Sequence, residues 1–391
     1  MDVVKPEVPV REVELRSDTF TRPSRKMLQA MMLAQTGDDV YGEDPTVNTL
    51  EERAAQKLGK EAACFMPSGT MANLSSILAH CPRGSKVVVG AESDIYVYEA
   101  AGASVCGGVA YHPVPNQADG TLRIEDIEAA FPQDPDDPQF ALPALICLEN
   151  PQNHTGGRVL PTAYLQVVRE VADRYAVPIH LDGSRLFNAA VATGSGAEFL
   201  ASFADSVQFC LSKGLCAPAG SMVVGRTEFI AKVRRIRKML GGGMRQSGVL
   251  AAAGLIALEE MSGRVGRDHA TALRLATALS EVPGIRLDPR PLQINMVFFE
   301  LDSVHEDASG LVRRAAQNGV RLAELGAGRI RCVTHAGVSA DDVDYAAGVI
   351  AAIVTGAEGP ASMRFAASGR LDSELDAEEV SDASRLEHAD A

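Results

Sequence analysis

The chain contains no tryptophan, no Cys-x-x-Cys pair and no apolar run long enough to span a bilayer. Its seven cysteines are an odd number, and several lie inside apolar segments, so we expect buried, reduced thiols instead of a disulfide framework. The first fifteen residues carry acids and bases and do not resemble a secretory signal. Together these absences predict a cytoplasmic protein that has no membrane partner.

The chain also has fewer basic residues than acidic ones, 37 against 51, which gives a formal net charge of −14. This balance argues against nucleic acid or an anionic membrane surface as the main partner. The charge is unevenly spread: residues 371–391 hold eight acids and one base, which supply half of the net charge. We expect an acidic, disordered tail over residues 356–391.

The chain shows no internal repeat, but strand and helix patterns alternate from about residue 60 to residue 260. This alternation predicts an α/β fold with a large, doubly wound, mainly parallel sheet. After about residue 265 the pattern changes to that of a smaller α+β domain. The predicted division is an N-terminal arm (1–14), a large domain (15–265), a small C-terminal domain (266–355) and the tail.

Two polar residues follow apolar runs that are typical of buried strands. Asp182 ends one such run, and Lys213 follows another, directly before a glycine. The carboxyl ends of parallel strands are where open α/β sheets place their active sites. A lysine that forms a Schiff base and a carboxylate that keeps a pyridine nitrogen protonated are what pyridoxal phosphate requires. No G-x-G-x-x-G turn follows the first strand, which disfavours a nucleotide-binding dehydrogenase.

A turn of small residues, Ser68-Gly69-Thr70, lies between a predicted strand and a predicted helix. Backbone N–H groups in such a turn can hold a phosphate at the positive end of the helix, or the turn can simply cap that helix. Arg185, three residues after Asp182, can reach the cofactor ring or a carboxylate, and its alternative is a surface salt bridge.

Seven motifs, in this order along residues 13–355, resemble the low-specificity L-threonine aldolase family. They are Leu15-Arg-Ser-Asp-Thr19, Gly37-Asp-Asp-Val-Tyr-Gly-Glu-Asp-Pro-Thr46, Pro67-Ser-Gly-Thr-Met71, Asp182-Gly-Ser-Arg-Leu-Phe-Asn-Ala189, Cys210-Leu-Ser-Lys-Gly-Leu-Cys-Ala-Pro218, Gly241-Gly-Gly-Met-Arg-Gln246 and Arg331-Cys-Val-Thr-His335. The resemblance implies the fold type I architecture of pyridoxal-phosphate enzymes. It also implies a homo-oligomer, usually a tetramer, with sites at a dimer interface, and cleavage of an amino-acid substrate to glycine and an aldehyde.

The resemblance also implies a role for each matching position. Lys213 would be the Schiff-base lysine, Asp182 would hold the pyridinium, and Arg185 would contact the ring. Gly69 and Thr70 would bind the phosphate, together with Ser68. The positions that would bind or surround the substrate are Ser17, Tyr41, Tyr98 and Arg331.

The sequence departs from the family at the positions of two pocket histidines. Asp94 stands where the family has a histidine that stacks on the ring, and a second histidine falls near Gln139, which we also assign to the substrate site. In a third segment, Gln152 replaces a histidine, and His154 follows it as a partial substitute. A base for the β-hydroxyl proton is still required, and Asp94 or a water can serve. The open alternatives are β-elimination, racemisation or transamination on the same cofactor, and a scaffold protein without activity.

Overall fold

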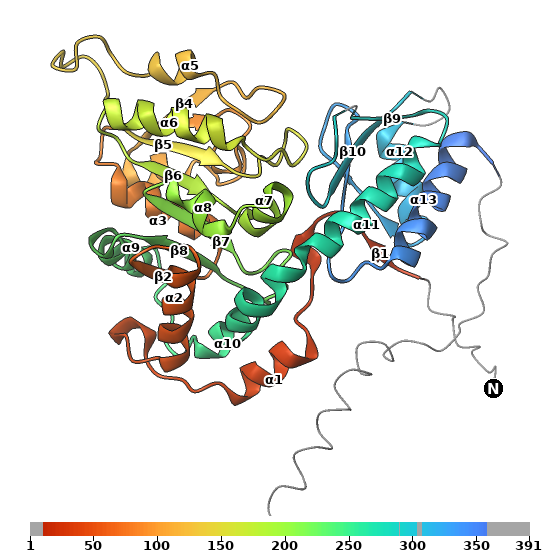
Figure 1. Cartoon of the computed structure of the whole chain (residues 1–391), viewed down its shortest axis with the longest axis horizontal. Helices are drawn as coiled ribbons and strands as arrows, with labels where there is room; N and C mark the ends of the chain where they lie inside the picture. The colour runs from red at the N-terminus through yellow and green to blue at the C-terminus, as the bar shows by residue number, and fades with distance from the viewer. Residues whose placement is uncertain (1–10, 289, 303–306, 358–391) are drawn as a thin grey trace, which may run out of the picture.

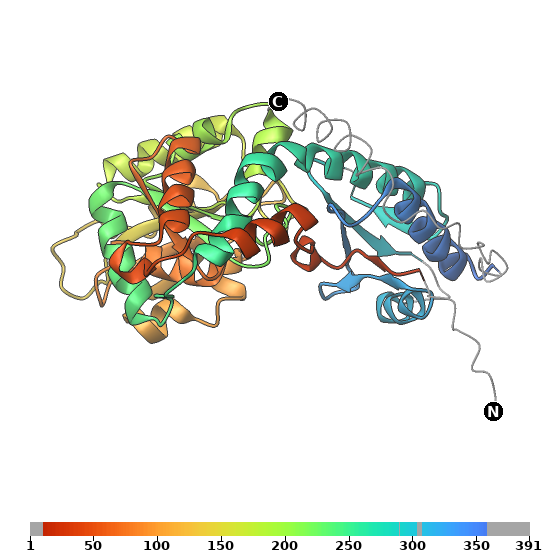
Figure 2. The same cartoon turned by 90° about the horizontal axis from the view of Figure 1, so that it is seen from below.

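The computed structural model describes residues 11–288, 290–302 and 307–357. These residues form a large unit and a smaller one, and the helix α11 (Ser262–Ser280) runs from the first into the second (Figures 1 and 2). No helix in the described ranges is both long enough and apolar enough to cross a membrane.

A seven-stranded sheet forms the centre of the large unit, in the order β2-β8-β7-β6-β5-β3-β4. Of its strands, β8 alone runs against the other six, because it pairs antiparallel with both β7 and β2. The predicted mainly parallel sheet is therefore confirmed. The strands are β2 (Ala62–Met66), β3 (Lys86–Gly90), β4 (Ala110–Val114), β5 (Pro143–Glu149), β6 (Ile179–Asp182), β7 (Ser206–Cys210) and β8 (Ser221–Gly225).

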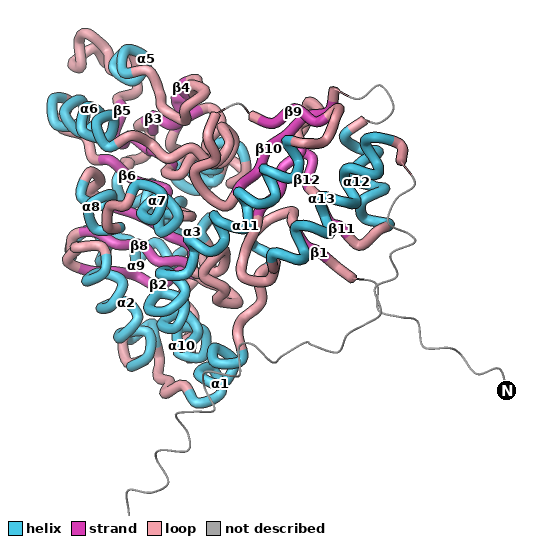
Figure 3. The backbone as a smooth tube through the Cα atoms, turned by 45° about the vertical axis from the view of Figure 1, so that its right-hand side comes forward, coloured by secondary structure: helices cyan, strands magenta, loops and turns pink. Residues whose placement is uncertain are grey.

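Helices cover both faces of this sheet, which explains why its strands are apolar at consecutive positions. Along β5, Ile146 packs into one hydrophobic cluster, whereas its neighbours Leu145 and Cys147 pack into another on the opposite face. Figure 3 shows the strands layered between helices. The helices on the first face are α2 (Pro45–Lys57), α6 (Thr162–Arg174), α7 (Leu186–Thr193), α8 (Ala197–Ser202) and α10 (Gly248–Ile256), and those on the second are α3 (Gly69–His80) and α9 (Thr227–Met239).

The small unit contains a four-stranded antiparallel sheet with helices packed against it. Its elements are β9 (Ile285–Leu287), β10 (Met296–Leu301), β12 (Ala323–Glu324), β13 (Ile330–Val333), α12 (Ala308–Gln317) and α13 (Ala340–Thr355). The short strand β1 (Val13–Glu14) pairs with β11 (Val320–Arg321), so that Val13 and Leu15 enter the small unit's core. The predicted division places Val13 in the arm and Leu15 in the large domain.

The predicted domain boundary at residues 265/266 falls inside α11. Val265 belongs to the large unit's hydrophobic core, whereas Ala272 and Leu275 belong to the small unit's core. One helix therefore contributes to both cores. Of the predicted tail, residues 358–391 lie outside the described residues.

Short elements complete the described chain. These are the α-helices α1 (Arg25–Leu33), α4 (Asp94–Val97) and α5 (Ile124–Glu128), the 3₁₀ turns η1 (Asp18–Phe20) and η2 (Asp39–Tyr41), and the π-helical turns η3 (Ala103–Gly107) and η4 (Ala257–Met261).

Candidate active site

A cavity of about 330 Å³ opens where β6 and β7 end. Because these strands are parallel neighbours, the loops after them leave the same edge of the sheet. Asp182, the last residue of β6, and Lys213, three residues after β7, both line the cavity. The other lining residues include Ser68, Gly69, Thr70, Asn73, Asp94, Tyr98, Glu99, Ser184 and Cys210.

The start of α3 forms one wall of this cavity. Ser68 is the N-cap, and its hydroxyl accepts the backbone N–H of Met71 at 3.2 Å. The N–H groups of Gly69 and Thr70 belong to the first turn, which has no earlier helical carbonyls to bond. A Cβ at Gly69 would lie 3.0 Å from the sulfur of Cys210, so a side chain there would crowd the wall. The capping interpretation is therefore correct, and the small turn also leaves room for an anion.

Asp182 is buried, and three N–H donors fix its carboxylate. Gln208 Nε2 (2.5 Å) and the backbone N–H of Ser184 (3.0 Å) donate to Oδ1, while Asn73 Nδ2 (2.9 Å) donates to Oδ2. The sequence analysis missed Asn73 and Gln208. Gln208 carried a signal, because it is a polar residue at a buried position of an apolar strand.

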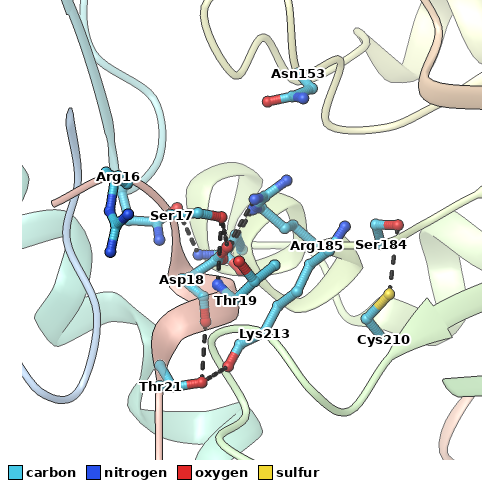
Figure 4. A network of polar contacts seen from close by, with 12 residues as sticks. Arg16, Ser17, Asp18, Thr19, Thr21, Asn153, Ser184, Arg185, Cys210 and Lys213 are labelled. Atoms are coloured by element: carbon cyan, nitrogen blue, oxygen red, sulfur yellow. Dashed lines mark hydrogen bonds and ion pairs between the residues drawn. The ribbon is translucent and has the colours of Figure 1, made fainter. Parts of the chain in front are cut away.

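Arg185 forms a buried ion pair with Asp18 and not the alternative surface salt bridge (Figure 4). Its Nε donates to Asp18 Oδ2 at 2.8 Å and its Nη2 to Oδ1 at 2.6 Å. Burial alone would raise the pKa of Asp18, but the guanidinium of Arg185, with smaller effects from Lys213 and Arg331, lowers it to about 2. The pair holds Arg185 in one position beside the loop that carries Lys213. Asp18 lies within a quoted motif, yet the sequence analysis gave it no role.

Ser17 and Arg331 approach the site from the chain's first segment and from β13. Ser17 is buried beside Asp18, to which its hydroxyl donates at 3.4 Å. Arg331 donates to Asn153 Oδ1 (3.0 Å) and to the carbonyl of Arg16 (3.1 Å). Its Nε is buried and has no partner among the described residues. Neither Ser17 nor Arg331 lines the 330 Å³ cavity, although the charge of Arg331 acts on Asp18.

Asp94 begins α4 and faces the cavity. Asn153 Nδ2 donates to its Oδ1 at 3.1 Å, and His154 Nε2 lies 3.9 Å from the same oxygen. The His154 ring stacks on Tyr98, with ring centroids 5.2 Å apart. Burial lowers the pKa of His154, although Asp94 partly offsets this effect. His154 thus adjoins Asp94 as a neutral imidazole behind the cavity wall.

Two of the residues assigned to the substrate site lie elsewhere in this chain. Tyr41 is 74% exposed, and Gln139 lies on an exposed loop, where its amide donates to Asp137. Neither lines the cavity. Tyr41 was assigned from its motif and Gln139 from its alignment with a histidine of the family, and neither source carries information about the distance to Lys213.

A larger cavity, of about 740 Å³, lies between the two units. It is lined by Arg286, Arg290 and Arg329 together with three carboxylates, and no lysine lines it. The smaller cavity is the candidate active site, because it combines a lysine amine, a fixed carboxylate and a helix start. This donor set fits pyridoxal phosphate, which needs one group for its aldehyde, one for its ring nitrogen and one for its phosphate.

Comparisons with known proteins identify the family of this chain. The model of the β-eliminating lyase family matches residues 14–302. Low-specificity L-threonine aldolase 1 of Arabidopsis thaliana is 46% identical over 338 residues, which cover 86% of this chain and 94% of that protein. Low specificity L-threonine aldolase of Escherichia coli (strain K12) is 43% identical, with 85% and 96% covered.

Solved structures show the same fold at lower identity. A threonine aldolase of Leishmania major superposes with a TM-score of 0.73 at 19% identity, over 87% of this chain and 99% of that one. A structure of SPT with pyridoxal phosphate gives 0.70 at 18% identity, with 88% of each chain covered. The predicted fold type I architecture and the predicted family are thus confirmed. Because the family model spans more than half of the chain, and relatives of high identity cover most of it, this chain belongs to the β-eliminating lyase family.

Proposed function

We propose that this protein is a pyridoxal-phosphate-dependent carbon–carbon lyase. It cleaves L-threonine, or a related β-hydroxy-α-amino acid, to glycine and an aldehyde. The observation that carries the proposal is the meeting of Lys213, Asp182 and the start of α3 in one cavity, with Asp94 on the wall. The relatives named as low-specificity L-threonine aldolases support the choice of substrate.

When bound, pyridoxal phosphate supplies the electron sink for breaking the Cα–Cβ bond. Lys213 presents its amine to the cofactor aldehyde. Asp182 holds a proton on the ring nitrogen, because a fixed carboxylate stabilises a cation beside it. Ser68, Gly69 and Thr70 would hold the phosphate of the cofactor with the N–H groups at the start of α3. Arg185, which Asp18 keeps in place, would contact the ring of the bound cofactor.

Arg331 and Ser17 bind the substrate carboxylate. A guanidinium offers a planar pair of donors that matches a carboxylate, and Arg331 retains an unpartnered Nε among the described residues. Asn153 and the Arg16 carbonyl orient the Arg331 side chain. Because Arg331 lies on β13, the small unit contributes directly to substrate binding.

Asp94, or a water that it holds, accepts the β-hydroxyl proton. Glu149 lies behind it and accepts the backbone N–H groups of Asp94 and Asn153, each at 2.8 Å. Burial, together with the charges of Asp94 and Asp182, raises the pKa of Glu149 well above its usual range. A raised pKa favours the neutral form of Glu149, and of these two side chains only Asp94 lines the cavity, where a base is required.

Tyr98, Tyr41 and Gln139 complete the substrate pocket in a homo-oligomer. Tyr98 lines the cavity within one chain, whereas Tyr41 and Gln139 are exposed and can reach only the site of a neighbouring copy. The protein acts in the cytoplasm, in agreement with the free thiols of all seven cysteines.

A product assay tests this function. The purified protein with pyridoxal phosphate is incubated with L-threonine, L-allo-threonine and L-phenylserine, and glycine, aldehyde and 2-oxo acid are quantified. Equal amounts of glycine and aldehyde support the proposal. The presence of Asp94 in place of a histidine favours one second candidate, another amino-acid reaction on the same cofactor. That reaction would incorporate solvent deuterium at Cα, or produce 2-oxo acid, without releasing aldehyde.

A further inference from the structure

A chain of buried polar side chains runs behind Asp182, away from the cavity. His80 Nε2 lies 2.9 Å from Ser206 Oγ, which lies 2.9 Å from His180 Nδ1. His180 Nε2 in turn lies 3.1 Å from Asn73 Oδ1. Asn73 Nδ2 then reaches two carboxylates, Asp182 Oδ2 at 2.9 Å and Glu99 Oε1 at 2.8 Å.

The hydrogen bonds of this chain have only one consistent direction. The amide nitrogen of Asn73 faces two carboxylates, so its oxygen must accept, and His180 must carry its proton on Nε2. The free lone pair on Nδ1 of His180 then accepts the hydroxyl of Ser206. The oxygen of Ser206 is left to accept the N–H of His80. Every donor along the chain therefore points toward Asp182 and Glu99.

Both imidazoles are neutral at neutral pH, as this direction requires. Burial lowers the pKa of His80 to about 4, and it lowers the pKa of His180 further, with the charge of His80 adding to the effect. A neutral histidine has one donor and one acceptor nitrogen, so it can transmit an orientation from one partner to the next.

The burial of these groups makes their hydrogen bonds costly to lose. His180 and Ser206 are fully inaccessible to solvent, and Asn73 is almost so. A buried polar group without a partner is strongly unfavourable, and aligned hydrogen bonds polarise one another in a medium of low dielectric. Burial also raises the pKa of Glu99 well above its usual range, although the bond from Asn73 opposes this effect. The raised pKa favours the neutral form of Glu99, which lines the cavity beside Asn73.

We propose that His180 is a positioning residue for the cofactor: through Asn73, it holds the carboxylate of Asp182 oriented toward the ring nitrogen. This inference rests on pyridoxal phosphate being the cofactor of the site, as proposed above. His180 touches neither substrate nor cofactor in this arrangement, because Asn73 and Asp182 stand between. Its effect is on how strongly the ring nitrogen keeps its proton.

The first measurement needs no cofactor. The ring nitrogens of ¹⁵N-labelled histidines are assigned by NMR in the cofactor-free protein at neutral pH. We expect His180 and His80 to be neutral and protonated on Nε2. A His180 that is charged, or protonated on Nδ1, overturns the proposal, because the chain would then run in the other direction or be broken.

The second measurement compares substitutions of His180. His180→Phe keeps a ring of similar size but removes both nitrogens, whereas His180→Gln retains an N–H donor for Asn73. His112→Phe, on the edge strand β4, is the matched control. The dissociation constant for pyridoxal phosphate and the ¹⁵N shift of its labelled ring nitrogen are recorded for each variant.

We expect His180→Phe to weaken cofactor binding about tenfold, because the variant loses about one hydrogen bond. We also expect the ¹⁵N signal of the cofactor's ring nitrogen to move from the pyridinium position toward the pyridine position. His180→Gln should stay near the wild type, as should His112→Phe. A His180→Phe protein that behaves like His112→Phe refutes the proposal, and so does a His180→Gln protein that is as impaired as His180→Phe. If His180→Phe does not fold, Ser206→Ala takes its place. Its control is Ser76→Ala, whose hydroxyl bonds the Ala72 carbonyl of its own helix.

These two measurements separate the inference from the proposed function. A wild-type protein that does not bind pyridoxal phosphate refutes both the cofactor assignment and the role of His180. A protein that binds the cofactor but releases no aldehyde refutes only the proposed reaction.

Discussion

The ion pair between Asp18 and Arg185 should be a major local determinant of stability, and Asp18→Asn tests this expectation. The substitution keeps the shape of the side chain but leaves a guanidinium that is 7% exposed without its counter-charge. Removing one partner of a buried pair typically costs about 3–5 kcal/mol, because the remaining charge is uncompensated. The pKa of Asp18 gives a second figure: the shift from 3.8 to about 2 corresponds to about 2 kcal/mol. The second figure is smaller because protonation removes only the charge, and the carboxyl group keeps its hydrogen bonds.

Urea unfolding, followed by circular dichroism and tyrosine fluorescence at fixed protein concentration, measures the change in the free energy of unfolding. The pair Arg274–Asp344 supplies the control, because it has the same N–O distance of 2.6 Å but lies on the surface. Asp344→Asn should cost less than about 1 kcal/mol. Equal effects of Asp18→Asn and Asp344→Asn would show that burial does not set the strength of the pair, which would refute the reasoning.

The Asp18–Arg185 pair also determines the direction in which the stability of the folded protein changes with pH. The pKa of Asp18 is lower in the folded protein than in the unfolded chain, so the stabilisation is fully present above about pH 4. It is lost as the pH falls toward 2. The wild type should therefore lose more stability than Asp18→Asn over this interval. Parallel pH profiles of the two proteins would count against the assignment.

Substitutions at three further positions test the site. Lys213→Ala should abolish the visible absorbance of the bound cofactor and all turnover while leaving circular dichroism unchanged, and retained turnover would exclude Lys213 as the cofactor lysine. Asp94→Asn should reduce aldehyde release by about 10²–10⁴-fold, because it removes the base, and it should have a much smaller effect on cofactor affinity. If Asp94→His instead gives a large gain in aldehyde release, the native pocket is not tuned for this cleavage. Gly69→Ala should weaken cofactor binding, since the new Cβ would lie 3.0 Å from the Cys210 sulfur; unchanged affinity in a dialysis assay would remove Gly69 from the phosphate site.

The sequence predicted those parts of the site that depend on strand ends. Asp182 and Lys213 follow apolar runs, and parallel pairing brings the ends of such runs to one edge, so their meeting needs no knowledge of side-chain packing. Ser68, Gly69 and Thr70 were found for a similar reason, because a strand, a small turn and a helix form a local unit.

Contacts between residues that lie far apart in the sequence were not predicted. Asp18 is separated from Arg185 by 167 positions, and nothing in either segment specifies the other. The strand β1 has only two residues, which is too few for a periodic pattern, and its partner β11 lies some three hundred positions later. His180 and Gln208 did carry a local signal, since a polar side chain inside an apolar strand needs a buried partner. The identity of that partner comes only from the fold.

The helix α11 affects how the large unit and the small unit are held together. Because Val265 packs in the large unit's core and Leu275 in the small unit's core, the helix is a rigid connection between the two units. Ile294, Met296, Phe298 and Val333 of the small unit also pack in the large unit's hydrophobic cluster, so shared apolar contacts join the two units in addition to the helix. The strand β13, which carries Arg331, is thus packed against both cores, so Arg331 reaches the site from a support that is fixed to the large unit and the small unit alike.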